Sequence, residues 1–333
     1  MTQAYITLDY ELGMGIATGT PEKCLIEPMN HLIAMTDKFG IKTNVFVDAA
    51  YLLQLRKLKD QYPQLQKDFE TVTSHLRKLD SEGHAVQLHL HPQWLFSSYD
   101  GEKWLLDFDH YKLSDMLLED QKQLIIDGVS LLNGLVSRKV KAFRAGGYSI
   151  ENFPDLYDTF LTVGINIDSS VLRGEHTIGK YQTYDYRKVP SKSKWCFYYN
   201  HKEENISGKM TEYPISTLVV PSVLYLFNKQ KKHKEFEDVK SSKLKWGDGV
   251  GIGYPGNRFL VLNKKIGMFF GKKSIRASID IGVDLEKVYN YSTSFYKGED
   301  FVIIGHPKAL SPFTIDVLEK FIKNHKELEF KLF

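Results

Sequence analysis

The sequence contains only two cysteines, Cys24 and Cys196, among its 333 residues. Two cysteines without Cys-x-x-Cys spacing exclude a disulfide framework and a thiolate metal site. No run of about 18 apolar residues occurs, which argues against a membrane-spanning helix. The charge is nearly balanced, with 44 basic and 41 acidic residues. This balance does not favour a general binder of nucleic acid polymers or of membranes.

The composition is that of a globular protein that folds in water. Hydrophobic residues make up 42% and charged residues 26% of the chain, close to the averages for such proteins. The first residues run directly into the apolar segment 4–8, without the basic and apolar regions of a signal peptide. We therefore expect no leader and a cytoplasmic location.

Short apolar runs alternate with longer amphipathic runs along most of the chain, a pattern typical of a parallel sheet with covering helices. The predicted strands are 4–8, 42–47, 84–90, 140–144, 164–167 and 301–305. The predicted helices are 28–39, 69–79, 115–136, 154–163 and 312–323. The pattern predicts an α/β fold, either a (β/α) barrel or a doubly wound sheet, in a single domain spanning 1–333.

Between about 192 and 279 the alternation breaks down, which predicts an irregular insertion. Its glycine-rich stretch 247–253 does not fit a dinucleotide fingerprint, because no apolar strand directly precedes it and Pro255 follows. The basic run 229–234 is typical of a solvated face. Together with the apolar run 218–227 it could mediate peripheral membrane contact, although internal packing followed by a solvated loop is the favoured interpretation.

Two carboxylates, Asp9 and Glu11, follow the first predicted strand. In extended backbone, side chains two residues apart point to the same side. Two anions held together repel unless a cation lies between them or one takes a proton. The pair could therefore supply a metal ligand beside a general base, and a solvated pair of acids is the alternative.

Two histidines, His89 and His91, have the same spacing at the end of the predicted strand 84–90. Both would project from one face as neutral imidazoles able to ligate a metal. With one carboxylate they would complete a set of two histidines and one acid, which leaves positions open for water and substrate. A hydrogen-bonded structural role is the alternative.

Further polar residues stand at other predicted strand ends. His306 follows the strand 301–305 and could donate a proton to a leaving group. Arg144 could hold a catalytic carboxylate ionised through a bidentate pair. Ordinary salt bridges are equally compatible with Arg144 and with Asp168. All these positions are where barrels and open α/β sheets place their sites.

Taken in chain order, five short segments form a recognisable set: Thr7-Leu8-Asp9-Tyr10-Glu11, His89-Leu90-His91-Pro92, Phe143-Arg144-Ala145-Gly146-Gly147-Tyr148, Asp168-Ser169-Ser170 and Ile304-Gly305-His306-Pro307. This set resembles the polysaccharide deacetylase family, also called the NodB homology family or carbohydrate esterase family 4. The resemblance spans about residues 4 to 323. It implies a distorted, incomplete (β/α) barrel with parallel strands and outer helices.

The resemblance also implies roles for the polar residues. Asp9 would be the general base and Glu11 the carboxylate that ligates a divalent metal, expected to be Zn²⁺, beside two histidines. Arg144 would orient Asp9. His306 would be the general acid, with Asp168 tuning it.

Two departures from the usual family pattern leave alternatives open. The second acid comes two residues after the first instead of directly after it, so the ligand is either Glu11 or Asp9. The usual His-x-x-x-His is absent, because Gln93 lies four residues after His89. We assign His91 as the second imidazole from its side-chain direction, with Gln93 as the alternative.

By resemblance, the expected activity is metal-dependent removal of an N-acetyl group from an amino sugar. Without a leader, the expected substrate is a nucleotide-linked or lipid-linked sugar of bacterial surface-polysaccharide biosynthesis. Trp94 and Tyr148 are expected as platforms for a sugar face, with ordinary packing as the alternative, and a backbone amide near Tyr148 as an oxyanion donor. Two rival functions remain: a catalytically inactive carbohydrate-binding relative, and hydrolysis of another C–N bond, as in a formamide or cyclic amide.

Overall fold

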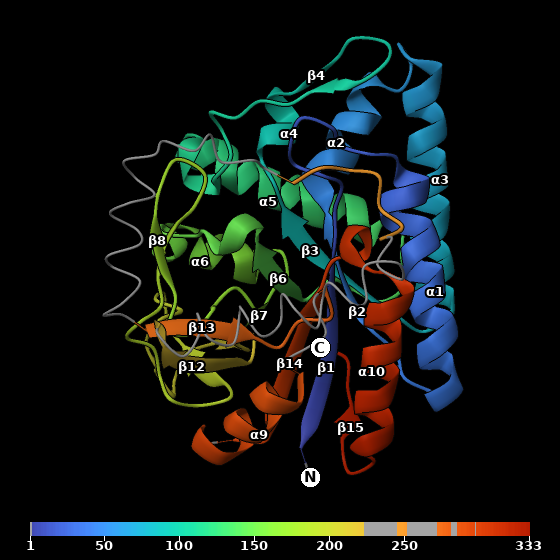
Figure 1. The fold of residues 1–333 in the computed structure, drawn as a ribbon. Coiled ribbons are helices and arrows are strands. Elements are labelled where there is room, and N and C mark those ends of the chain that lie inside the picture. Colours follow the sequence, from blue (N-terminus) through green and yellow to red (C-terminus); the bar gives the residue numbers. More distant parts are fainter. Residues whose placement is uncertain (1, 223–244, 252–271, 281–284, 297) are drawn as a thin grey trace.

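The computed structural model describes residues 2–222, 245–251, 272–280, 285–296 and 298–333 (Figure 1). Its centre is a nine-stranded sheet with the order β10-β11-β7-β6-β3-β2-β1-β14, and β15 also pairs with β1. These strands are β1 (Gln3–Tyr10), β2 (Asn44–Asp48), β3 (Ala85–Leu90), β6 (Ala142–Ala145), β7 (Ile167–Asp168), β10 (Trp195–Phe197), β11 (Met210–Glu212), β14 (Asp300–Gly305) and β15 (Glu329–Phe330). All neighbours pair in parallel except β10 and β11, which are antiparallel.

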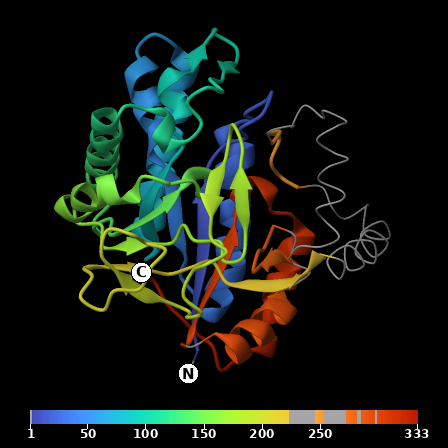
Figure 2. The same ribbon diagram turned by 90° about the vertical axis from the view of Figure 1, so that its left-hand side faces the viewer.

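Helices lie around the outside of the curled strands (Figures 1 and 2). They are η1 (Glu22–Ile26), α1 (Glu27–Thr36), η2 (Asp37–Phe39), α2 (Ala49–Leu58), α3 (Pro63–Ser81), α4 (Gln93–Phe96), η3 (Leu113–Asp115), α5 (Leu118–Asn133), η4 (Gly146–Tyr148), α6 (Phe153–Thr162), α9 (Leu285–Phe295), η6 (Pro307–Ala309) and α10 (Pro312–Asn324). Every residue of β2, β3 and β14 is buried. Strands covered on both faces carry the nearly continuous apolar runs seen in this sequence.

Beyond β14 the curled sheet continues through irregular backbone. The amide of Ile304 donates to the carbonyl of Ala277, and the amide of Ile279 donates to the carbonyl of Ile304. The amide of Ser216 donates to the carbonyl of Val302 on the same strand. These bonds extend the sheet toward closure without a further regular strand. The expected distorted (β/α) barrel, with parallel strands and outer helices, is confirmed.

All six predicted strands belong to the main sheet, and all five predicted helices form. Two longer helices were not predicted from the sequence: α2, which follows β2 without a loop, and α9. Within the expected insertion, β10 and β11 join the main sheet. The remaining strands form two-stranded sheets: β4 (Ser98–Tyr99) with β5 (Trp104–Leu105), β8 (His176–Ile178) with β9 (Thr183–Asp185), and β12 (Thr217–Pro221) with β13 (Lys272–Arg276).

Most of the segment considered for membrane contact, including the basic run 229–234, lies outside the described residues. In the part of the chain that is described, no helix has the length and apolar character needed to cross a membrane.

The described part of the glycine-rich stretch, 247–251, packs against the loop that follows β1. The amide of Gly15 donates to the carbonyl of Val250 at 2.9 Å, and the amide of Val250 donates to that of Ala17 at 2.8 Å. A Cβ atom on Gly15 would lie 2.3 Å from the Gly251 carbonyl oxygen. Glycine is needed there because the two backbones approach each other so closely.

Candidate active site

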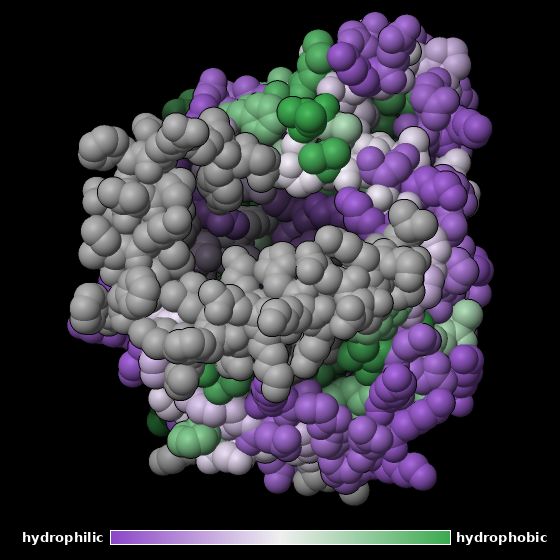
Figure 3. All heavy atoms as spheres, in the orientation of Figure 1, coloured by the Kyte–Doolittle hydropathy of each residue, from purple (hydrophilic) through white to green (hydrophobic). Residues whose placement is uncertain are grey.

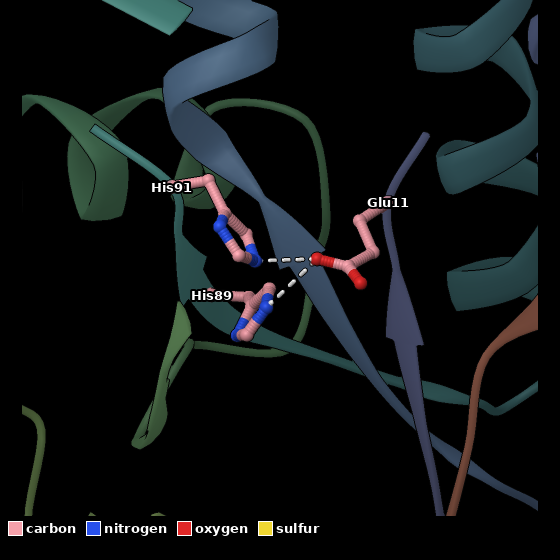
Figure 4. Close-up of side chains that lie close together, drawn as sticks. All are labelled: Glu11, His89 and His91. Carbon is pink, nitrogen blue, oxygen red and sulfur yellow. Dashed lines mark hydrogen bonds and ion pairs between the residues drawn. The ribbon is translucent and has the colours of Figure 1, made fainter. Parts of the chain in front are cut away.

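Three buried side chains converge at the carboxyl ends of β1 and β3. Glu11 Oε2 lies 2.5 Å from His91 Nε2 and 3.3 Å from His89 Nε2 (Figure 4). One ligand atom from each residue lies within 4.8 Å of the others, a grouping that could hold a metal ion. On the face shown in Figure 3, hydrophilic side chains gather in a hollow over these strand ends.

Local structure fixes which nitrogen His89 presents. His89 and His91 lie two residues apart at the end of β3 and therefore project to the same side. The Nδ1 of His89 lies 2.8 Å from the carbonyl oxygen of Arg144, which can only accept a hydrogen bond, so Nδ1 carries the proton. In the neutral form of the ring, Nε2 then carries the lone pair that a metal ion would take, on the side that faces Glu11.

Close packing holds the second histidine in place. The amide of His91 donates to Asp48 Oδ1 at 3.1 Å. A Cβ atom on Gly146 would lie 2.4 Å from the carbonyl oxygen of Leu90 and 2.9 Å from the His91 ring. The first glycine after β6 is therefore required for the imidazole to take this position.

The charged groups of the cluster shift one another's pKa values. Burial opposes ionisation of Glu11, but Lys308 and His91 outweigh it and hold the pKa of this carboxyl well below its usual range. Burial lowers the pKa of His89, yet Asp9 and Glu11 outweigh this effect and raise it to about 9. Protons and a metal ion would thus compete for the same lone pairs. The donor set of two imidazoles and one carboxylate fits a divalent cation.

The structure distinguishes the alternatives left by the sequence. Glu11, not Asp9, faces the two imidazoles, and His91 occupies the second histidine position. Gln93 is buried on α4, where its Nε2 lies 3.3 Å from the sulfur of Met14.

Asp9 instead forms a buried ion pair with Arg144. The Nη1 atom of Arg144 donates to Asp9 Oδ1 at 2.8 Å, and the arginine side chain is 0% exposed. Its other nitrogens donate to the carbonyl and hydroxyl oxygens of Ser169, each at 2.9 Å. Arg144 therefore has a single orientation, and it leaves Asp9 Oδ2 directed toward His306 Nε2, 3.6 Å away.

His306 is oriented by an acid that the sequence did not suggest. Asp280 Oδ2 lies 2.8 Å from His306 Nδ1, and Asp280 Oδ1 accepts from the His306 amide at 2.7 Å. Burial opposes a charged His306, but Asp280 outweighs it and raises the pKa of the imidazole. The Nε2 atom faces Asp9 and lies 3.7 Å from Glu11 Oε1.

The expectation that Asp168 tunes His306 is wrong, because Asp280 fills that position. Asp168 Oδ1 accepts a hydrogen bond from the Ser170 hydroxyl at 2.6 Å. Its register partner on β11 is Glu212, whose Oε1 accepts from the amide of Val171. Burial raises the pKa of Asp168 from its ordinary 3.8 to about 6, and burial together with Asp168 raises the pKa of Glu212 well above 4.5. The two acids form a buried pair behind Arg144 that loses its protons at higher pH than exposed carboxyls do.

This acid pair should make stability depend on pH. Because the folded-state pKa values are raised, the unfolded chain releases its protons first, and the free energy of unfolding falls as pH rises through the raised values. Replacing Glu212→Gln removes one acid and should flatten this fall. Melting temperatures at about pH 5 and about pH 8 measure it. Glu102→Gln, at an exposed acid, should behave as wild type, and an equal fall in all three proteins would contradict the account.

The two expected sugar platforms differ in their surroundings. Tyr148 is buried, with 8% of its side chain and backbone exposed, has a positive φ of 61°, and its hydroxyl accepts a hydrogen bond from Arg276 at 3.1 Å. Trp94, by contrast, is 0% exposed and packs its ring 4.7 Å from Tyr51 and 5.2 Å from Trp104, measured between ring centroids. Trp94 has no free face for a sugar, so the packing alternative holds for it.

A core role for Trp94 predicts a large effect on stability. Trp94→Ala should lower the free energy of unfolding by about 3–5 kcal/mol, because it leaves a cavity among aromatic rings. Denaturant titration measures the change. Ile178→Ala, at a side chain 88% exposed, should change stability by less than about 0.5 kcal/mol. A small loss in Trp94→Ala, similar to that control, would contradict the packing role.

No protein-family model and no curated protein matches the sequence. Solved structures similar to the chain include a family 4 carbohydrate esterase from Streptomyces lividans in complex with acetate, at 11% identity over 99% of this chain and 92% of that one, with a TM-score of 0.41. A polysaccharide deacetylase from Bacillus cereus is 11% identical over 100% and 92% of the two chains, with a TM-score of 0.39. An allantoinase is 12% identical over 99% and 86%, with a TM-score of 0.45.

Proposed function

We propose that the protein is a metal-dependent hydrolase that removes an N-acyl group from an amino sugar. The observation that carries the proposal is the convergence of Glu11, His89 and His91, with Asp9 and His306 beside them. Two imidazoles and one carboxylate are a donor set typical of catalytic zinc, which keeps a position open. A divalent cation held there, proposed to be Zn²⁺, would polarise an acyl carbonyl and lower the pKa of a water molecule.

The residues beside the donor set fit the two proton transfers of amide hydrolysis. Arg144 holds Oδ1 of Asp9, so Oδ2 is the atom that accepts a proton from the attacking water. Asp280 binds Nδ1 of His306 and leaves Nε2 to protonate the departing amine. The separation of 3.6 Å between these two atoms lets both reach one reacting centre. A backbone amide near Tyr148 is the proposed oxyanion donor.

The finer assignments belong to the same proposal. They are an N-acetyl amino sugar on a nucleotide or lipid carrier, a role in bacterial surface-polysaccharide biosynthesis, and a cytoplasmic location. Cell fractionation tests the location, and purified nucleotide-linked and lipid-linked sugars test the carrier.

The proposal is tested with the Zn²⁺-loaded protein by measuring acid release from N-acetyl and N-formyl amino sugars and ring opening of a cyclic amide. We expect acetate release that stops with a chelator and returns when metal is added back. Formate release alone, or cleavage of a cyclic amide instead, would assign the site to another C–N bond. Metal binding without release from any of these substrates would indicate an inactive carbohydrate-binding relative.

A further inference from the structure

A lysine contacts the proposed metal-ligating carboxylate. Lys308 lies on η6, two residues after His306, and its Nζ donates to Glu11 Oε1 at 2.8 Å. The same Nζ donates to the carbonyl oxygen of Leu12 at 2.7 Å. The lysine side chain is 20% exposed. Two short hydrogen bonds from one ammonium fix its position.

The two carboxylate oxygens of Glu11 therefore have different partners. Oε2 faces the histidines, at 2.5 Å from His91 Nε2 and 3.3 Å from His89 Nε2. Oε1 faces away from them and is bound to Lys308. A carboxylate can bind a metal through one oxygen or through both. Here the lysine occupies the oxygen that a bidentate ligand would need.

We propose that Lys308 is a positioning residue that restricts Glu11 to ligating a metal through Oε2 alone. The inference rests on the proposed function of this cluster as a metal centre. Its first consequence concerns coordination, because a ligand that uses one oxygen leaves a further position for water and the acyl oxygen. The second concerns charge, because an ammonium so close to the ligand withdraws electron density from it and repels the bound cation.

Lys308 also explains how the buried carboxylate is tolerated when no metal is bound. Glu11 and both histidines are buried, and a buried charge without a partner is strongly destabilising. The lysine supplies that partner from a neighbouring strand end. Lys308 thus stabilises the Glu11 carboxylate before a metal binds, and it weakens metal binding in doing so.

The test is the affinity for Zn²⁺, measured by competition with a chromophoric chelator. Lys308→Met removes the repelling charge and frees Oε1, so we expect binding to be tighter by about tenfold or more. Turnover should fall in the same variant by about 10-fold to 100-fold, as for other groups that orient metal ligands. Lys308→Arg retains the charge and should bind Zn²⁺ much as wild type does.

Two further variants complete the test. Lys308→Gln keeps a hydrogen-bond donor and loses the charge, so it should also bind Zn²⁺ more tightly and serves if the methionine variant does not fold. Lys122→Met removes a lysine from a surface pair with Glu119 and should change nothing. Unchanged or weaker Zn²⁺ binding in both Lys308→Met and Lys308→Gln would overturn the role of Lys308. Absence of Zn²⁺ binding by the wild-type protein would instead overturn the proposed function itself.

Discussion

The substitution His91→Ala is expected to weaken binding of Zn²⁺ by more than about 100-fold. This loss is larger than that caused by substituting residues that only contact the metal ligands. The Nε2 atom of His91 makes the shortest contact with Glu11 in the cluster, at 2.5 Å. Its removal leaves one imidazole and one carboxylate, too few protein ligands for a catalytic zinc site. Acyl release should fall to background with the metal.

The loss is measured by metal content after dialysis and by thermal shift. A ligand that binds only the folded state raises the melting temperature, so Zn²⁺ should stabilise the wild-type protein and not His91→Ala. His110→Ala is the matched control, since His110 pairs with Asp107 in a partly exposed loop. Equal Zn²⁺ content in His91→Ala and wild type would place the metal elsewhere.

Replacing Asp9→Asn is expected to abolish most activity while the metal stays bound. Asp9 contacts Arg144 and lies near His306, but it is not among the three grouped ligands. An amide cannot take the proton that the carboxylate accepts, so the rate should fall by about 10²-fold to 10⁴-fold, the contribution of a general base.

The diagnostic feature of this variant is the separation of turnover from metal affinity. Zn²⁺ content should remain at the wild-type level in Asp9→Asn while acetate release falls. Asp60→Asn, at an acid whose side chain is 81% exposed, controls for loss of a charge. If Asp9→Asn lost its metal together with its activity, Asp9 would be a ligand and the division of roles with Glu11 would be wrong.

The framework of the site could be predicted because it depends on local rules. Buried parallel strands need apolar runs, and these identified all six strands that carry or flank the site. Spacing of two residues placed His89 and His91 on one side of β3, and the ends of parallel strands meet at one edge of a sheet. The juxtaposition of Glu11 with both histidines, which are 78 or more residues away in sequence, follows from those two facts.

The contacts that could not be predicted from the sequence depend on how distant segments pair in the fold. Asp280 and Asp168 both stand near strand ends, and only the pairing of the 277–279 backbone with β14 brings Asp280 to His306. Asp168, on β7, pairs instead with Glu212, its register partner on β11. Lys308 reaches Glu11 because η6 turns the chain back after His306. No local pattern marks these contacts.

Trp94 shows the limit of reasoning from residue type. An aromatic ring beside a histidine motif suits both a sugar platform and a core, and the choice depends on what lies above it. Tyr51 and Trp104, from α2 and β5, cover the ring. Only the assembled fold contains that information.

The most direct test of the account is an anomalous-scattering map of crystals grown with saturating Zn²⁺. We predict one strong peak bound by Glu11 Oε2 and by the Nε2 atoms of His89 and His91, with Glu11 Oε1 still on Lys308. A map without a peak at these atoms, or with the ion on Asp9 or Gln93 instead, would contradict the central claim that this cluster is a metal centre.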